Sequence, residues 1–303
     1  MSRHPTPWTA NGKLKVHPFS PNLLAMIRFT LCPDYWHHDI ADGQCMYLGI
    51  IKYLLQQEDD VDALFMDNLA ESLPLGVEEP TLCTPGVWPT KSELKGDWEY
   101  EIPPTPLPPT ACDNYSSAED NQATMRETFV EEARMKMMSG PHTMEEAAKE
   151  CDCTMDKLFT GAMGARVEKD KIRPIFDATK SHVNDHIQRN TAERTTAPGL
   201  QDAMHAIAWL HRDAVQTGIP RKLTMLKSDV SKAHRRCKIQ KKDWKYQVAK
   251  LGDEYWINKV GTYGVASAQL YWGRTAAAFT RLLYYLFPQV YWFFIFVDDI
   301  IAI

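Results

Sequence analysis

The chain has 303 residues, of which 44% are hydrophobic and 24% are charged. This is enough apolar material for a globular core and for more than one domain. The first residues contain no apolar stretch of the secretory type, and the most apolar tract, residues 282–303, is interrupted by Pro288, Gln289, Asp298 and Asp299. Because a membrane span needs about 20 apolar residues in succession, we expect an intracellular protein, in the cytoplasm or nucleus, with no membrane partner.

The net charge of −5 averages two unlike halves. Residues 1–160 carry 12 Lys and Arg against 26 Asp and Glu, whereas residues 161–303 carry 22 against 13. The densest basic run extends from Lys232 to Lys245. A basic half joined to an acidic extension favours a polyanionic partner such as nucleic acid. An ordinary solvated face is the alternative interpretation of the basic run.

Seven cysteines are scattered through a chain without secretory features, so we expect reduced thiols. Neither His37–His38 nor Cys151 with Cys153 has a second pair of ligands at zinc-site spacing. The sequence therefore predicts no zinc site.

Residues 1–100 predict a mostly helical, acidic extension, with apolar positions recurring every three or four residues in 20–31 and 43–73. Residues 101–112 are rich in proline and predict an extended linker. Beyond it, Ser117 and Thr143 are candidate caps of helices over 117–140 and 143–159.

The periodicity then changes. Residues 171–177 predict a strand, 199–215 an amphipathic helix and 223–230 a second strand. Residues 245–260 predict a β-hairpin with its turn at Gly252–Asp253. A long helix over 264–286 follows, and residues 290–303 predict a strand, a tight turn and a strand.

Asp298 and Asp299 lie side by side within that last apolar hairpin. Two adjacent carboxylates repel each other unless a cation neutralises them, and Mg²⁺ prefers oxygen ligands. Asp229 closes an apolar strand and supplies a third acid, so the set suits a two-metal-ion site for phosphoryl chemistry. A polar hairpin turn at Asp298–Asp299 and a helix N-cap at Asp229 are the structural alternatives.

Four segments resemble, in the same order, motifs of reverse transcriptases (RNA-directed DNA polymerases) from gypsy-type long-terminal-repeat retrotransposons and related retroelements. They are Lys171–Asp177 (KIRPIFD), residues 228–236 (SDVSKAHRR), residues 263–274 (YGVASAQLYWGR) and residues 296–300 (FVDDI). The resemblance covers roughly residues 165–303. It implies an α+β fold with right-hand polymerase fingers (113–225) and palm (226–303), whose antiparallel palm sheet packs on helices. The thumb would be absent from this chain.

The resemblance also implies roles for single residues. Asp229, Asp298 and Asp299 would be the catalytic acids and, with the carbonyl of Val230, the metal ligands. The nucleotide-binding positions would be Lys171, Arg173, Ser231, Lys232, Ala233, His234, Tyr263 and Gly264. Among these, Lys171 and Arg173 would hold the triphosphate, backbone amides of 231–234 would cradle it, and His234 would reject a 2′-hydroxyl. Asn184 matches a family asparagine at longer spacing.

The implied reaction is template-directed DNA synthesis with two Mg²⁺ ions, Mn²⁺ being an alternative metal. The implied partners are an RNA or DNA template with its primer and deoxynucleoside triphosphates. The sequence departs from the family where His234 replaces the usual Tyr or Phe, and where Ser267 and Gln269 replace Asn and Pro. A non-catalytic nucleic-acid-binding remnant is one alternative. A viral RNA-dependent RNA polymerase is another, although that class usually has Gly at the position of Val297.

Overall fold

The structure is a computed structural model in which residues 46–84, 86–93, 111–169, 171–219, 225–288, 290 and 292–303 are described. The α+β class expected from the sequence is confirmed. The helices are α2 (Leu48–Gln57), α3 (Phe65–Glu71), α4 (Ser116–Glu119), α5 (Gln122–Arg134), α6 (Met144–Glu150), α7 (Val183–Arg189), α8 (Leu200–Thr217) and α9 (Ala266–Leu286). The strands are β1 (Met138–His142), β2 (Thr160–Glu168), β3 (Lys171–Asp177), β4 (Leu226–Asp229), β5 (Val248–Leu251), β6 (Glu254–Asn258), β7 (Phe293–Phe296) and β8 (Asp299–Ala302).

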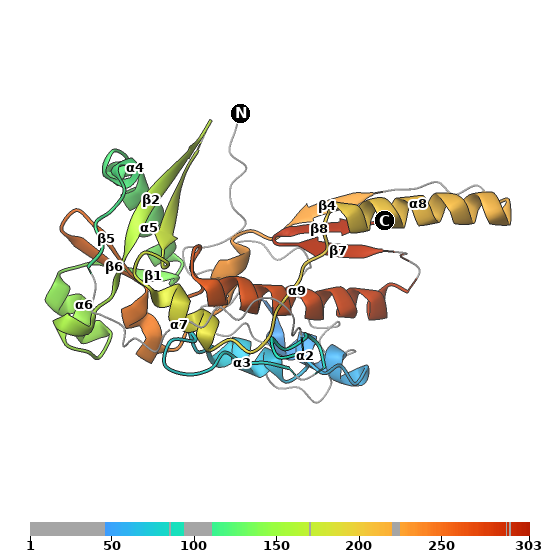
Figure 1. Cartoon of the computed structure of the whole chain (residues 1–303), viewed down its shortest axis with the longest axis horizontal. Coiled ribbons are helices and arrows are strands. Elements are labelled where there is room, and N and C mark those ends of the chain that lie inside the picture. Colours follow the sequence, from blue (N-terminus) through green and yellow to red (C-terminus); the bar gives the residue numbers. More distant parts are fainter. Residues whose placement is uncertain are drawn as a thin grey trace, which may run out of the picture.

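Helix α9 runs through the middle of the molecule, between a five-stranded sheet at one end and a three-stranded sheet along its other half (Figure 1). Its side chains explain this central position, because Tyr271 and Trp272 are completely buried. One apolar cluster extends from Leu48 to Leu282 and joins the N-terminal helices to α9. Tyr271 and Trp272 are therefore core residues, and α9 is the element on which both sheets depend.

The five-stranded sheet has the order β1-β6-β5-β2-β3. Its pairs are antiparallel except β2 with β5, which is parallel. The predicted hairpin turn at Gly252 is confirmed, and its φ of 59° explains the glycine, since this region is costly for other residues. The long β2–β3 hairpin projects from the body of the protein (Figure 1).

The three-stranded sheet has the order β4-β8-β7, all antiparallel. Its register gives each face a different character, because side chains alternate along a strand. Ile295 and Ile300 pack in the apolar cluster around Trp272 of α9. On the opposite face, Asp229, Asp299 and Phe296 lie in one row across the three strands. Lys227, Ile301 and Phe294 lie in the next row on that face. We call this second surface the acid face of the three-stranded sheet.

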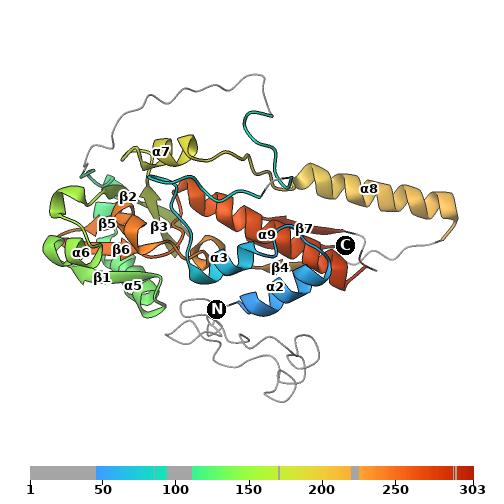
Figure 2. The same cartoon turned by 90° about the horizontal axis from the view of Figure 1, so that it is seen from below.

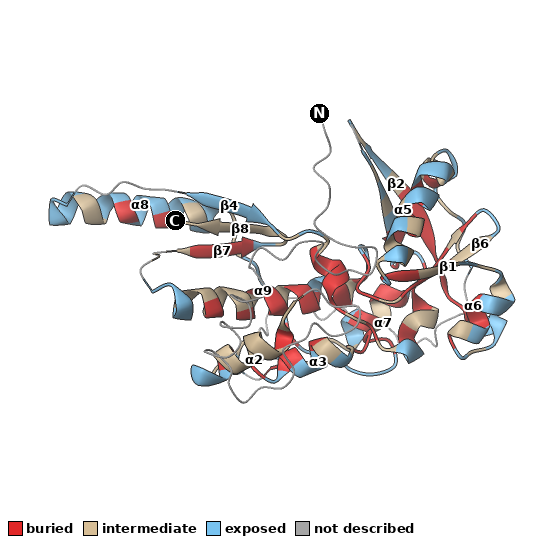
Figure 3. Cartoon of the chain, turned by 180° about the vertical axis from the view of Figure 1, so that it is seen from behind, coloured by how far each residue is buried: buried red, intermediate tan, exposed pale blue. Residues whose placement is uncertain are grey.

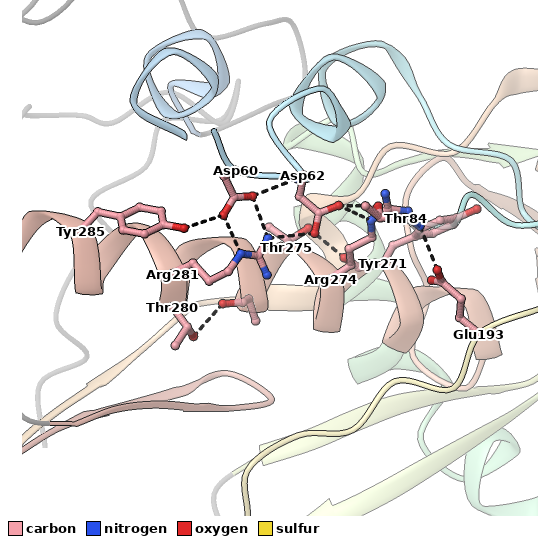
Figure 4. Close-up of polar contacts among 11 residues, drawn as sticks. Asp60, Asp62, Thr84, Glu193, Tyr271, Arg274, Thr275, Thr280, Arg281 and Tyr285 are labelled. Atoms are coloured by element: carbon pink, nitrogen blue, oxygen red, sulfur yellow. Dashed lines mark hydrogen bonds and ion pairs between the residues drawn. The ribbon is translucent and has the colours of Figure 1, made fainter. Parts of the chain in front are cut away.

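The segment that contains helices α2 and α3 lies along α9, on the side away from the three-stranded sheet (Figures 1 and 2). Buried ion pairs fasten it there (Figure 4). Asp62 is fully buried and lies 2.9 Å from Nε of Arg274 and 2.9 Å from Nη2 of Arg281, while Asp60 lies 2.6 Å from Nε of Arg281. Residues 46–84 therefore belong to the same core as α9.

Most of the elements expected in the second half are confirmed, including Lys171–Asp177, α8, the β5–β6 hairpin, α9 and the final hairpin. Three predictions for the first half are wrong in extent. The helix expected over 117–140 is broken into α4 and α5, and its end is strand β1. The helix expected over 143–159 ends at Glu150, and the helix expected over 43–73 is interrupted between α2 and α3.

The capping predictions have opposite outcomes. Thr143 caps α6 in a reciprocal arrangement with Glu146, as expected. Ser117 caps no helix, because its hydroxyl accepts a hydrogen bond from the Ala165 amide of β2 at 3.1 Å. The predicted helix over 20–31, His37–His38 and almost all of the proline-rich linker lie outside the described residues.

Candidate active site

Three acids from two distant segments meet on the acid face. Asp229 at the end of β4 stands directly opposite Asp299 at the start of β8, and Asp298 lies in the turn just before. Partial burial, followed by the charges of Asp298 and Asp299, raises the pKa of the Asp229 carboxyl. Lys227 on the same face lies 3.0 Å from Asp299. The acids predicted from sequence are therefore brought together, and their mutual repulsion is a property that a bound cation would relieve.

The turn that presents these acids is short and strained. Phe296 pairs with Asp299, so Val297 and Asp298 are the only residues between the strands. Val297 has a φ of 55°, a left-handed conformation that is rare for a β-branched residue. The Trp272 indole donates a hydrogen bond to the Val297 carbonyl, and the Val230 amide donates one to the Asp298 carbonyl at 2.7 Å. Helix α9 and the segment after β4 thus hold the turn in place.

Asp229, Asp298 and Asp299 supply oxygen ligands of the kind that a magnesium ion takes. Mg²⁺ in proteins commonly takes one or two carboxylates together with substrate phosphates. Asp229 and Asp298, which lie within hydrogen-bonding reach of each other, fit as those two carboxylates. Asp299 pairs with Lys227, and no group of three or more His, Cys, Asp or Glu in the described ranges has a geometry that could hold a metal ion. Asp229 and Asp298 therefore suit a magnesium ion whose remaining coordination positions are filled by phosphate oxygens.

The segment after β4 folds back tightly beneath the acids. Lys232 adopts a left-handed conformation, and the Ser231 carbonyl accepts hydrogen bonds from Arg236 at 2.9 and 2.6 Å. Ala233 and His234 are buried at the start of a 3₁₀ turn, whereas Ser231 is exposed. The carbonyl of Val230 precedes this turn, so the predicted cradle 231–234 is a compact loop with one exposed residue.

His234 is buried at 7% exposure beside the exposed ring of Tyr263, with ring centroids 5.0 Å apart. Its Nε2 lies 2.6 Å from Oε1 of Gln269 on α9, and its Nδ1 is buried without a hydrogen-bond partner in the described structure. An unpaired ring nitrogen in a buried position is costly. The pair His234–Tyr263 forms a ring platform at the site, and Gln269 orients the imidazole.

Gly264 connects this platform to the five-stranded sheet. Its φ is 96°, and an added Cβ would come within 1.8 Å of the Phe176 carbonyl oxygen on β3. Asn184 of α7 donates to the Gly264 carbonyl at 2.8 Å and accepts from the Ala266 amide at 2.8 Å. Asn184 thus closes the first turn of α9, and no residue larger than glycine fits at position 264.

The cations predicted on β3 differ in their surroundings. Lys171 and Arg173 are both exposed, and Nε of Arg173 lies 3.0 Å from Glu168 at the end of β2. Burial raises the pKa of Tyr263, and Asp298 and Arg173 act on it with opposite signs. The charges of Arg235 and Glu132 act on the Tyr263 hydroxyl more strongly than those of Asp298 and Arg173, and no described contact connects Lys171 or Arg173 to the acids.

Several residues that support the site were not recognised in the sequence. Glu132 of α5 binds Lys232 at 2.8 Å and Arg235 at 2.6 Å, which anchors the loop after β4. Burial raises the pKa of Glu132, but the charges of Arg235 and Lys232 outweigh that effect and lower it overall. A glutamate among the other glutamates of an amphipathic helix gives no local signal of such a role. Only the packing of α5 against β1 and β3 places it there.

None of the described helices is both long enough and apolar enough to cross a membrane.

The described cysteines are free thiols: Cys83, Cys112, Cys151, Cys153 and Cys237. Burial raises the pKa of the Cys151 thiol to about 12, so at neutral pH it is a protonated core residue.

No protein-family model matches the chain, and no curated protein matches it. Among solved structures, a foamy viral protease-reverse transcriptase in complex with double-stranded DNA matches with a TM-score of 0.39 and 13% identity, over 67% of this chain and 30% of that one. A Prototype Foamy Virus protease-reverse transcriptase mutant matches with a TM-score of 0.40 and 12% identity, over 67% of this chain and 22% of that one. The chain spans less than a third of either of these proteins, and at these scores the geometry of its own site must carry any assignment of function.

Proposed function

We propose that this chain contains the fingers and palm of a template-directed polymerase of the reverse-transcriptase type, from a gypsy-type or related retroelement. The observation that carries the proposal is the meeting of Asp229 with Asp298 and Asp299 on one sheet face, from segments about 70 residues apart. A strained two-residue turn serves to present those acids. Strained backbone of this kind concentrates at functional sites.

In this proposal Asp229 and Asp298 hold Mg²⁺, or Mn²⁺ in its place, and the carbonyl of Val230 lies beside them. The bound metal would lower the pKa of the primer 3′-hydroxyl and neutralise charge on the triphosphate. The protein's own contribution is positioning. The loop 231–234 faces the phosphates, and the His234–Tyr263 platform supports the sugar. Arg173 then grips the phosphates through its guanidinium.

The test is calorimetric titration of Mg²⁺ in the presence of a deoxynucleoside triphosphate. Asp298→Asn removes one negative charge from the acid face, so we expect Mg²⁺ affinity to fall sharply. Asp253→Asn is a matched control, because Asp253 is an exposed acid in the turn of another hairpin. Equal Mg²⁺ affinity in wild type and the Asp298→Asn variant would remove the basis of the proposal.

Two ion pairs favour a second candidate, a nucleic-acid-binding remnant without catalysis. Arg173 is paired with Glu168, and Lys232 is paired with Glu132. Both cations therefore already have an acidic partner. Single-nucleotide primer extension distinguishes the two functions. Extension that requires Asp298 supports the polymerase, whereas tight binding of primer–template without extension supports the remnant. A preference for ribonucleotides would indicate the RNA polymerase alternative.

A further inference from the structure

A cleft opens on the acid face, at the end of the sheet away from the acids. It has a volume of about 730 Å³ and lies between α8, β7 and two loops near residues 88 and 197. Its walls contain four aromatic side chains: Trp88, Trp209, Trp292 and Phe294. Phe294 and Phe296 are two positions apart on β7 and share the acid face. The cleft is therefore continuous with the surface on which Asp229 and Asp299 lie.

The rings in this cleft are arranged as flat surfaces. Trp292 and Phe294 are parallel, with an interplanar angle of 1° and centroids 6.0 Å apart. Trp209 of α8 meets Trp292 edge-on at 6.3 Å. Helix α8 begins beside the sheet and then projects beyond it, with most of its surface exposed (Figures 1 and 3). Trp209 keeps 45% of its surface exposed, so an added planar group can reach its ring.

The polar groups of the cleft specify what kind of planar group it suits. The indole nitrogens of Trp88 and Trp292 are buried, and neither has a hydrogen-bond partner in the described parts of the chain. Indole nitrogens can only donate, so both lack an acceptor. Arg212 and His205, both exposed, line the same cleft, whereas the Asp202 carboxylate already accepts from the Gly199 amide at 2.6 Å.

We propose that this cleft binds one unpaired nucleotide of a single-stranded nucleic acid, an inference that rests on the proposed function. The base stacks on the exposed ring of Trp209, where stacking tolerates any base, and its edge faces Trp292, which stands nearly perpendicular to Trp209. Carbonyl oxygens or ring nitrogens of the base accept from the two indoles, and the phosphate of the nucleotide faces Arg212. A purely apolar ligand would leave both indole donors unsatisfied. The exposed Arg212 in the lining favours a phosphate-bearing strand over a peptide that has few acidic residues.

The spacing along β7 fits a continuous strand. Trp292 lies four residues before Phe296, which pairs with Asp299. Four residues extend about 13 Å along a strand. A stacked nucleic-acid strand rises about 3.4 Å per nucleotide, so about four stacked nucleotides cover this distance. A strand whose end lies at the acids therefore reaches the cleft.

The experiment uses the full chain and three probes: a thymidine octanucleotide, an abasic octamer with the same number of phosphates, and thymidine monophosphate. Binding is followed by tryptophan fluorescence and by anisotropy of labelled octamers. Base stacking at one site should make the thymidine octamer bind about tenfold more tightly than the abasic one. Trp209→Ala should abolish that ratio and leave abasic binding unchanged, and Trp292→Phe, which keeps a ring but loses the donor, should reduce it.

Met204→Ala is the matched control, because Met204 is an exposed apolar residue of α8 that does not line the cleft. It should leave the ratio intact. Equal binding of the two octamers by wild type, or a base-dependent ratio that persists in Trp209→Ala, would overturn the inference. Monophosphate binding as tight as that of the octamer would also overturn it, because the site would then take free nucleotides. Asp298→Asn should not change the ratio, so unchanged Mg²⁺ affinity in that variant together with an intact ratio would refute the proposed polymerase and leave the nucleotide cleft standing.

Discussion

Val297 shows how much of this site depends on a single backbone angle. Its φ of 55° places a β-branched side chain in the left-handed region, immediately before the adjacent acids. Hydrogen bonds from Trp272 and Val230 to the turn compensate for that strain. The site therefore maintains an unfavourable local conformation through contacts made by distant elements, which is the expected pattern for a functional turn.

Replacing Val297 by glycine should relieve this strain. A non-glycine residue in a sparsely populated region costs about 1–3 kcal/mol, and glycine adds about 0.5–1 kcal/mol of unfolded-state entropy. We expect Val297→Gly to raise the free energy of unfolding by about 1 kcal/mol in urea titration. Val167→Gly is the control, because Val167 is an exposed residue in the regular strand β2 and its loss should destabilise the protein. Destabilisation by Val297→Gly as large as that of the control would show that the turn is not strained.

At the scale of elements, two buried ion-pair clusters decide how helices meet the sheets. Glu132 joins α5 to the loop after β4 through Lys232 and Arg235, and the Arg235 side chain is only 2% exposed. Asp62 joins the α2–α3 segment to α9 (Figure 4). Removing one member of a buried pair costs more than the pair contributes, because the remaining charge is left unpaired.

Glu132→Gln should lower the free energy of unfolding at pH 7 by about 3 kcal/mol, measured by denaturant titration. The pKa of Glu132 is lowered in the folded protein, so its stabilisation is present above the unfolded pKa of about 4.3. That stabilisation is lost as the pH falls through the lower folded value, and the difference between wild type and variant should shrink below about pH 4. Glu254→Gln, which breaks the exposed pair with Arg126, should cost no more than about 1 kcal/mol. A wild-type advantage that does not diminish in acid would mean that the charge of Glu132 is not the cause.

Asp62→Ala should be more damaging, at about 3–5 kcal/mol, because it leaves Arg274 and Arg281 facing a buried gap. The matched control is Asp67→Ala, which removes an exposed partner of Lys52 and should cost about 0–1 kcal/mol. Thermal unfolding of both variants measures the difference. Similar losses for the two would show that the α2–α3 segment is not fastened to α9 through Asp62.

At the scale of the whole molecule, the separation of charge along the chain should govern binding to nucleic acid. Residues 161–303 carry 22 Lys and Arg against 13 Asp and Glu. Binding through phosphate contacts releases counterions, so the logarithm of affinity should fall linearly with the logarithm of salt concentration. Acidic residues of the first half already pair with Lys232, Lys242 and Lys245 of the basic run, so these three cations should contribute less to the effect than cations outside such pairs.

Lys171→Gln should reduce the salt slope of primer–template binding by about 0.9, the value for one lost phosphate contact. Lys171 is an exposed residue on the projecting β2–β3 hairpin. Lys149→Gln on α6 removes an equal charge from a separate element and should leave the slope unchanged. Anisotropy titrations between low and moderate salt decide the matter. An equal change of slope in both variants would indicate diffuse attraction rather than a contact at the hairpin.

Local patterns in the sequence determined the elements whose signals are short-range. The β5–β6 turn at Gly252, the helix α9 and the strand–turn–strand at the end of the chain follow from alternation, periodicity and turn residues over a few positions. Strand β2 gave no such signal, because Thr160–Glu168 contains two glycines and little alternation. It is a strand through its pairing with β3 along seven positions.

The candidate acids were also identifiable in the sequence, since adjacent aspartates in an apolar hairpin are costly without a function. Their convergence, by contrast, is decided by the register of β4 against β8, and the orientation of His234 by Gln269 of α9. The partners of Glu132 and Asp62 lie 100 or more residues away, and the aromatic cleft is assembled from loops, α8 and β7. Such contacts depend on which faces pack together once the chain is compact. Tertiary structure alone decided them, because the long-range partner of a side chain leaves no periodic pattern in the sequence around that side chain.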